Sequence, residues 1–202
     1  MDLFKAHPWH GIPAETEDKR VNAFIEIVPS DTVKYEIEKE SGYLMIDRPQ
    51  KFSNIVPALY GFVPQTYCGD EVASYCKEKT GRDSIIGDGD PLDICVLTER
   101  DVTHGNILVR CKVIGGFRMI DGGEADDKII AVLANDEIYT WNDISECSEA
   151  ILNRLKHYFL TYKQIPKNGQ APACEITHTY GREEAEEVFK RSRKDYATKF
   201  KQ

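Results

Sequence analysis

A short acidic stretch, Gly87–Asp93 (GDGDPLD), stands directly before the apolar run Ile94–Leu97. Its carboxylates, Asp88, Asp90 and Asp93, fall within six consecutive positions, among glycines and a proline that oppose a regular helix. Like charges this close repel one another unless a cation lies between them. A hard divalent cation with oxygen ligands fits this requirement. The stretch therefore favours a metal-binding turn that leads into a buried strand.

Two other structures compete for this motif. Clusters of aspartate, glycine and proline often form plain turns. An EF-hand loop is the second alternative, since Asp88 and Asp90 fit its first and third positions and Glu99 its twelfth. However, Leu92 replaces the fifth ligand and Asp93 stands at the invariant glycine. The strand-like run that follows also opposes the flanking helix, so the EF-hand is rejected.

Strand-like patterns lie on both sides of the acidic stretch. Upstream, alternating apolar and polar residues over 23–28, 33–38 and 43–47, separated by turns, predict a meander. Downstream, the runs 94–97, 107–120 and 128–133 predict further strands, and Gly115–Gly116 marks a bulge or sharp bend in the longest run. Many short strands followed by helices predict a mainly β, α+β chain: an antiparallel barrel or sheet with helices outside.

Helical spacing is confined to the last quarter of the chain. Apolar residues from Ile151 to Tyr162 recur at helical intervals before Pro166, and a second helix is predicted from Arg182 to Lys199. Residues 1–20, with His7 and His10, are expected to form a docked arm, and residues 65–87 a long loop, with a short strand near Tyr67 left open. The length of 202 residues fits a single domain, 1–202.

Composition limits the classes of function. The chain carries 34 acidic and 26 basic residues, a net charge of −8, which argues against non-specific binding to nucleic acid or anionic lipid. No stretch approaches 18 apolar residues, and the first ten residues contain no apolar signal core, so a cytoplasmic protein is expected. Six cysteines without a C-x-x-C spacing fit reduced thiols packed as small hydrophobes, with a Cys68/Cys76 metal or redox pair as the weaker alternative.

Other polar positions are ordinary when each is taken alone. A second acidic segment, Asp121–Lys128, lies between two predicted strands and could be a plain hairpin loop. Lys34 and Glu36 could be solvent-facing residues of an edge strand, and neither Arg48 nor the pair Tyr162–Lys163 is unusual.

The order of these segments, however, resembles the soluble inorganic pyrophosphatases of the first family. Their signature, D-[small or polar]-D-P-x-D, is matched by Asp88–Asp93. Further blocks match in order between Ala23 and Lys163: Glu26–Ile27, Lys34–Ile37, Asp47–Arg48, Pro57–Gly61, Asp121–Lys128 and Tyr162–Lys163.

The resemblance implies a distorted five-stranded antiparallel barrel of the OB type with two helices outside. It also implies magnesium-dependent hydrolysis of pyrophosphate to two phosphates, by direct attack of a water or hydroxide that bridges metal ions, with Mn²⁺ or other divalent ions as substitutes. A symmetric homo-oligomer is expected, a hexamer in preference to a dimer.

Residue roles follow from the same resemblance. Asp88, Asp93 and Asp126 would hold the tight activating metal, Asp121 and Glu36 the metals that arrive with substrate, and Glu26 would act mostly through water. Asp90 would be the general base. The phosphoryl groups would be contacted by six residues, the first four of them also catalytic: Lys34, Arg48, Tyr60, Lys128, Tyr162 and Lys163.

Two departures and three competing functions stay open at this point. Many family members have tyrosine at the position of Val56, and relatives often have an acid at that of Gly122. A metal-dependent nucleotide phosphohydrolase would need an apolar platform for a base, which does not stand out near the acidic segments. A nucleic-acid-binding OB module would need exposed basic and aromatic residues. A calcium-binding structural protein would leave the lysines and Arg48 without a purpose.

Overall fold

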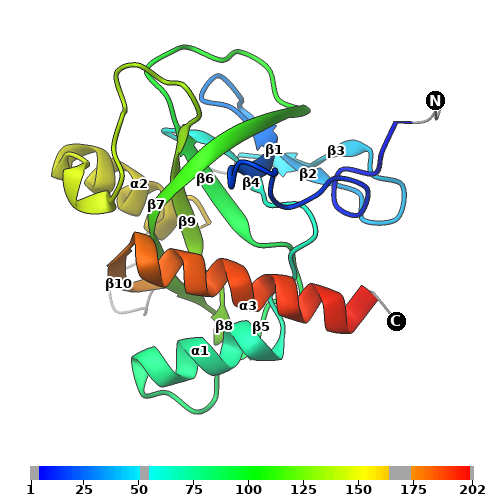
Figure 1. Ribbon diagram of the computed structural model, residues 1–202, viewed down its shortest axis with the longest axis vertical. Coiled ribbons are helices and arrows are strands. Elements are labelled where there is room, and N and C mark those ends of the chain that lie inside the picture. The colour runs from blue at the N-terminus through cyan, green and yellow to red at the C-terminus, as the bar shows by residue number, and fades with distance from the viewer. Residues whose placement is uncertain (1–4, 51–54, 164–173, 201–202) are drawn as a thin grey trace.

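A closed ring of five strands forms the centre of the molecule (Figure 1). The computed structural model describes residues 5–50, 55–163 and 174–200. Around the ring, the order is β1 (Val21–Ile27), β4 (Leu59–Phe62), β6 (Asp93–Leu97), β9 (Lys128–Leu133) and β7 (Ile107–Asp121), with β7 pairing back onto β1. The predicted distorted barrel is thus confirmed. Its pairing is antiparallel except between β6 and β9, which run parallel, so the expectation of a wholly antiparallel barrel was wrong at that pair.

The long strand β7 closes the ring because it pairs with different partners along its length. Ile107–Cys111 pair with β1, whereas Gly115–Asp121 pair with β10 (Cys174–Gly181), a strand that the sequence pattern did not predict. The register of β7 against β9 shifts between Val113 and Gly115, which confirms the predicted irregularity. A Cβ atom at Gly116 would lie 2.5 Å from the Tyr180 ring, so the close approach of β10 requires glycine there.

The remaining strands lie beside the ring. β2 (Val33–Ile37) and β3 (Leu44–Pro49) form a separate two-stranded hairpin, which confirms the second half of the predicted meander. The first half was wrong, because β1 pairs with β4 and β7 and belongs to the other sheet. The short strands β5 (Ile86–Gly87) and β8 (Glu124–Ala125) pair in parallel and join the two acidic segments at the edge of the sheet. This pairing brings together residues that are more than thirty positions apart in the sequence.

Helices pack outside the barrel. The predicted C-terminal helices are α2 (Glu149–Thr161) and α3 (Arg182–Phe200), and a 3-10 turn, η1 (Ile144–Glu146), precedes α2. The segment 65–87, predicted as a long loop, contains the helix α1 (Asp70–Thr80), so that prediction was wrong. Its first turn is capped from a distance: the Asp195 carboxylate of α3 accepts hydrogen bonds from the backbone N–H groups of Gly69, Glu71 and Val72 at 2.9–3.1 Å.

The apolar core has two large parts, because barrel strands bury both faces. On β6, Ile94 and Val96 face one cluster, shared with α1 and α3, and Cys95 and Leu97 face the other, shared with α2. All six cysteines, each within the described residues, are buried free thiols. None of the helices in the described part of the chain is long and apolar enough to cross a membrane.

The N-terminal arm docks on the barrel through Trp9. The Trp9 side chain is buried in a third cluster with Phe24, Phe62 and Tyr196, and its indole N–H donates to the Thr66 carbonyl at 2.8 Å. His10 Nδ1 lies 2.7 Å from the Tyr196 hydroxyl. The first four residues of the arm lie outside the described residues.

A buried ionic network joins the barrel to the helices at its side. Arg118 of β7 contacts the Asp127 carboxylate at 3.1 Å and the Glu184 carboxylate of α3 at 2.8 Å. The Tyr180 hydroxyl donates to Asp127 at 2.8 Å, and the Tyr75 ring of α1 lies 5.0 Å from the guanidinium carbon. The Arg118 and Asp127 side chains are only 1% and 2% exposed. Burying either charge without the other would cost much free energy, so each stabilises the other.

We expect Arg118→Met to lower the free energy of unfolding by about 3–5 kcal/mol, because it leaves the buried Asp127 carboxylate without a neighbouring cation. Urea denaturation at pH 7 measures this loss. Arg182→Met is the matched control: it removes an exposed pair with Glu186 and should cost no more than about 0.5 kcal/mol. Equal losses in the two variants would contradict the structural role of the network.

Candidate active site

One cavity at the mouth of the barrel gathers nearly all the polar residues that the sequence singled out. It lies where β6, β9 and the turn after β7 meet the β2–β3 hairpin. Its charged and tyrosine side chains are Glu26, Lys34, Glu36, Lys39, Tyr60, Asp88, Asp90, Asp93, Asp121, Glu124, Asp126, Lys128, Tyr162 and Lys163. Of the thirteen predicted site residues, only Arg48 is absent from this lining.

The centre of the cavity is set by the parallel register of β6 and β9. Asp93 pairs with Lys128 at the first position of both strands, and the Lys128 ammonium bonds to the Asp93 carboxylate and, at 2.5 Å, to Asp126. The Tyr60 hydroxyl donates to the same Asp93 oxygen as Lys128, at 2.5 Å from Oδ2. Burial opposes the charge of Lys128, but Asp126 and Asp93 outweigh it and raise the lysine pKa well above its usual value. Lys128 is therefore a buried cation held between two carboxylates.

The acidic turn before β6 is fixed by backbone contacts with the segment that precedes α1. The Gly89 N–H donates to the Cys68 carbonyl at 3.0 Å, and the Cys68 N–H donates to the Asp90 carbonyl at 2.8 Å. Gly89 has φ +76°, a conformation that favours glycine. Burial, followed by the nearby Asp126 charge, raises the pKa of Asp88 to about 9. Without added cations, the folded protein therefore disfavours the ionised form of Asp88.

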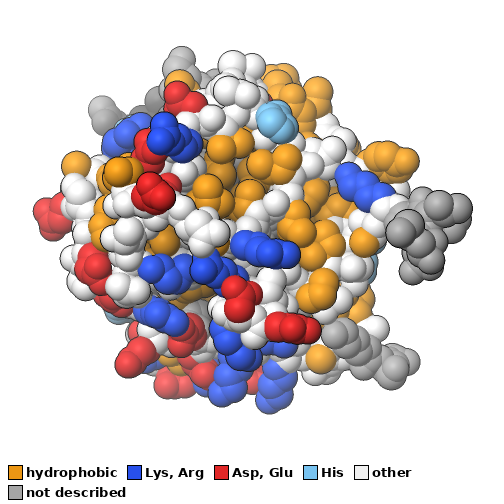
Figure 2. Space-filling model, turned by 45° about the horizontal axis from the view of Figure 1, so that its top comes forward, with side chains coloured by type: hydrophobic (Ala, Val, Ile, Leu, Met, Phe, Trp, Pro, Cys, Tyr) orange, Lys and Arg blue, Asp and Glu red, His pale blue; other side chains and the backbone are white. Residues whose placement is uncertain are grey.

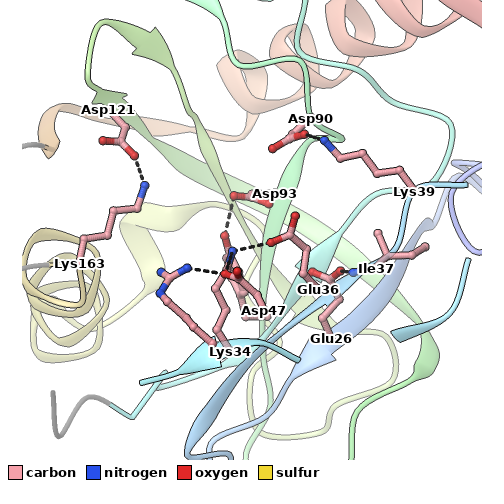
Figure 3. Close-up of polar contacts among 12 residues, drawn as sticks. Glu26, Lys34, Glu36, Ile37, Lys39, Asp47, Asp90, Asp93, Asp121 and Lys163 are labelled. Atoms are coloured by element: carbon pink, nitrogen blue, oxygen red, sulfur yellow. Dashed lines mark hydrogen bonds and ion pairs between the residues drawn. The ribbon is translucent and has the colours of Figure 1, made fainter. Parts of the chain in front are cut away.

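The β2–β3 hairpin supplies the opposite wall (Figure 3). The Glu26 carboxylate on β1 accepts a hydrogen bond from the Ile37 N–H at 2.7 Å, which ties the hairpin to the barrel. Burial raises the pKa of Glu26 to about 8. Beside it, the Lys34 ammonium contacts Glu36 at 2.7 Å and Asp47 at 3.0 Å.

Arg48 lies next to this wall but does not line the cavity. Its guanidinium pairs with Asp47, its neighbour along β3, and Asp47 in turn contacts Lys34. Asp47 therefore links Arg48 to Lys34 of the cavity wall. The sequence blocks predicted that Arg48 itself would line the cavity, but Asp47 lies between them.

Tyr162 and Lys163 reach the cavity from the end of α2. Thr161 is the last residue of the helix, and Tyr162 is its cap, with its N–H bonded to the Tyr158 carbonyl at 2.9 Å. The two tyrosine rings stack at 5.1 Å between centroids. Lys163 pairs with Asp121 at the end of β7.

Two cavity residues were missed from the sequence, Lys39 and Glu124. Lys39 lies in the β2–β3 turn and pairs with Asp90. Glu124 begins the two-residue strand β8. Lys39 lies outside every block that matched the family, whereas Glu124 lies inside the block Asp121–Lys128 but was given no role there. The folded structure brings both side chains to the cavity.

The donor set suits hard divalent cations. Eight carboxylates and four lysines line the cavity among the described residues, a formal excess of four negative charges when all are ionised. Within the described parts of the chain, no three His, Cys, Asp or Glu side chains already surround one point; instead, lysines neutralise the carboxylates in pairs. Burial, together with neighbouring carboxylates, raises the pKa values of Asp88 and Glu26, so both would ionise more readily beside a cation. Oxygen donors with excess negative charge fit Mg²⁺ or a similar ion.

Residues 23–197 match the family described as inorganic pyrophosphatase. The chain belongs to the inorganic pyrophosphatase family. It is 51% identical over 200 residues to inorganic pyrophosphatase of Chlamydia muridarum, covering 96% of this chain and 95% of that protein. It is 38% identical over 180 residues to soluble inorganic pyrophosphatase of Zea mays, with coverage of 88% and 75%. The solved inorganic pyrophosphatase of Thermus thermophilus superposes with a TM-score of 0.76 at 26% identity, over 95% of this chain and 99% of that one.

The two positions that depart from the pyrophosphatase pattern, Val56 and Gly122, lie in a buried apolar cluster and in an open turn, respectively. Val56 is buried in the apolar cluster shared with α2, so this position contributes packing instead of a hydroxyl. Gly122 has φ +59° in the turn between β7 and β8, with no other atom near the place of a Cβ. Glu124, two residues later, lines the cavity and supplies a carboxylate to this wall.

Charged side chains on one outer face of the molecule lie in mixed patches (Figure 2). On the face shown in Figure 2, basic and acidic side chains are intermixed at one side of an apolar region, and no continuous basic surface crosses that face. This agrees with the exclusion of a nucleic-acid-binding module for that face.

Replacing Glu26 with Gln should stabilise the metal-free protein at alkaline pH. The folded pKa of about 8 exceeds the ordinary 4.5, so between these values the unfolded state loses its proton first and stability falls as pH rises. Glutamine keeps an oxygen for the Ile37 N–H and removes this penalty. With EDTA present, we expect the variant to gain on the order of 2 kcal/mol over the parent protein at pH 9 and almost nothing at pH 4.

Chemical denaturation across this pH range measures the difference. Glu78→Gln, at an exposed position on α1, is the control and should show no such pH-dependent gain. A constant offset between the Glu26 variant and the parent at every pH would refute the assignment.

Proposed function

We propose that the chain hydrolyses pyrophosphate to two phosphates with magnesium ions held in the acidic cavity. The observation that carries this proposal is the charge arrangement: eight carboxylates, four lysines and two tyrosines around one small space. The cavity volume is about 180 Å³, below the roughly 300–1,000 Å³ of pockets for drug-sized ligands. A small anion with its cations therefore suits it better than a nucleotide.

The carboxylates divide into sets according to the family pattern. Asp88, Asp93 and Asp126 would hold the tightest cation, with Asp121 and Glu36 contributing to further cations and Glu26 acting mainly through water. Bound magnesium would lower the pKa of a coordinated water and offset the charge of the diphosphate. The observation that supports this division is that, after burial, the charges of Asp126 and Asp93 raise the pKa of Asp88, so the three carboxylates interact.

The cationic and hydroxyl side chains would bind the phosphoryl oxygens. Lys34, Lys128 and Lys163 each pair with a carboxylate of the cavity, so each is positioned at its wall. Tyr60 and Tyr162 add hydroxyl donors without a full charge. Arg48 would reach a phosphoryl group after leaving Asp47. Ammonium groups of this kind stabilise charge that develops on a leaving phosphate.

Asp90 is the proposed general base. Its backbone N–H bonds to Asp88 Oδ1 at 2.9 Å, and its carbonyl accepts from Cys68, so the main chain holds the residue at the cavity wall. Its side chain is about half exposed, at 47%, and is accessible to a water in the cavity. A base at this place can accept the proton of the attacking water, and no covalent intermediate is needed.

Several features of the sequence analysis stay predictions. These are the cytoplasmic location, the homo-oligomer with a hexamer preferred to a dimer, and the substitution of Mg²⁺ by Mn²⁺ or other divalent ions. The assignment of 1–202 to one domain also stays a prediction.

The substrate and cation are tested together by phosphate release from pyrophosphate and from ATP. We expect rapid magnesium-dependent hydrolysis of pyrophosphate, little hydrolysis of ATP, and loss of activity when EDTA is added, because the anion is repelled by the bare carboxylates. Comparable rates on ATP would favour a nucleotide phosphohydrolase instead.

Replacing Asp90 with Asn should lower kcat by at least about 100-fold, the range expected for loss of a general base. Magnesium affinity, measured by isothermal titration calorimetry, should change far less. Asp83→Asn, at an exposed position after α1, is the control for charge removal. A near-normal rate in the Asp90 variant would show that another group accepts the proton.

A further inference from the structure

Lys39 has no assigned role, yet its side chain lines the cavity. It lies in the turn between β2 and β3 and extends across the cavity to pair with Asp90, which comes from the acidic turn on the opposite side (Figure 3). The contact joins residues 51 positions apart. Lys39 is therefore the link between the hairpin wall and the residue proposed as general base.

The turn that presents Lys39 is held in place from two sides. Within the turn, the Glu38 carboxylate accepts a hydrogen bond from the Ser41 N–H at 2.7 Å, and the Gly42 N–H donates to the Glu38 carbonyl at 2.8 Å. On the outside, a Cβ atom at Gly42 would lie 2.8 Å from side-chain atoms of both His7 and Pro8. The N-terminal arm thus packs directly against the turn. The backbone at Lys39 is therefore held in a fixed position, from which the side chain extends into the cavity.

Lys39 is the most exposed of the four cavity lysines. Its side chain is 46% exposed, compared with 35% for Lys163, 23% for Lys34 and 2% for Lys128. Its single described carboxylate partner, Asp90, is 47% exposed. Ion pairs between exposed groups contribute little net free energy, so this pair can open at small cost. Lys128, in contrast, is enclosed between two carboxylates.

The charge of Lys39 is secure. Burial in the cavity would lower its pKa, but Asp90, Glu36 and Asp88 together raise the pKa above the usual value of a lysine. Lys39 is consequently a cation with several carboxylates near it, none of which encloses it. An entering anion can compete for such a group more readily than for the other three.

We propose that Lys39 is a further substrate-binding residue whose ammonium exchanges the Asp90 carboxylate for a phosphoryl oxygen when a phosphate anion enters the cavity. The exchange also frees Asp90 to accept a hydrogen bond from water. No covalent bond is made or broken in this step. The inference rests on the proposed function for the identity of the anion, but its contact can be tested by binding alone.

The test compares Lys39→Gln with Lys39→Arg in the magnesium-loaded enzyme. Phosphate affinity is measured by isothermal titration calorimetry, and KM and kcat are measured with pyrophosphate. We expect the glutamine variant to weaken phosphate binding and raise KM by about tenfold, the effect of losing one charge-assisted hydrogen bond, and the arginine variant to recover most of the loss. Lys190→Gln, which removes an exposed pair with Glu187 on α3, is the matched control and should leave both values unchanged.

Three results would overturn the proposal: unchanged phosphate affinity and KM in Lys39→Gln, a lower kcat with both of those values unchanged, or an equal loss in the glutamine and arginine variants. The second result would mean that Lys39 only orients Asp90. Failure of this proposal is distinguished from failure of the proposed function by the activity of the parent enzyme. If the parent does not hydrolyse pyrophosphate, the proposed function is rejected, but phosphate binding by the parent and the variants can still be compared.

Discussion

The site depends on the attraction between one buried lysine and two carboxylates. Lys128 starts β9, Asp93 starts the neighbouring parallel strand β6, and Asp126 precedes Lys128 by two positions. Because side chains alternate between the faces of a strand, a slip of one residue in this pairing would turn Lys128 away from Asp93. It would also move Ile129 and Ile94 out of the apolar cluster that they share. The same register thus builds the core and the electrostatic centre of the cavity.

The parts of the fold that could be predicted are those encoded locally. Alternation identified β1, β2 and β3, strand-like runs identified β6, β7 and β9, and helical spacing identified α2 and α3. Helix α1 was missed because its sequence carries little apolar periodicity and its N-cap, Gly69, has no capping side chain. The cap comes instead from Asp195, more than a hundred residues later. A helix whose first turn is stabilised by a distant carboxylate cannot be recognised from its own residues. β10 was missed for a related reason, since its pairing partner is the second half of β7.

The predicted site divides in a similar way. Acidic and basic residues within matched blocks converge on the cavity because the blocks sit at strand ends that the barrel brings together. Arg48 belongs to a matched block, yet its contact with Asp47 places it outside the lining, because pairing with a neighbour on β3 competes with reaching inward. Lys39 could not be foreseen, because its direction is set by the Glu38 hydrogen bonds and by the packing of the arm on Gly42. Sequence order therefore identified most of the charges that converge on the cavity, but tertiary contacts decide how far each side chain reaches.

The cavity and the core place opposite demands on the free energy of the protein. Buried carboxylates with raised pKa values, such as Asp88 and Glu26, favour the unfolded chain at neutral pH, where they could ionise freely. Apolar clusters on both faces of the barrel strands offset this cost, since β6 and β9 bury residues on either side. Cations that bind only the folded chain would stabilise it further by mass action. The acidic cavity is thus tolerated because it is built on strands with two buried faces. In the proposed function, the carboxylates would attract the cations, and the lysines that already lie among them would bind the anion.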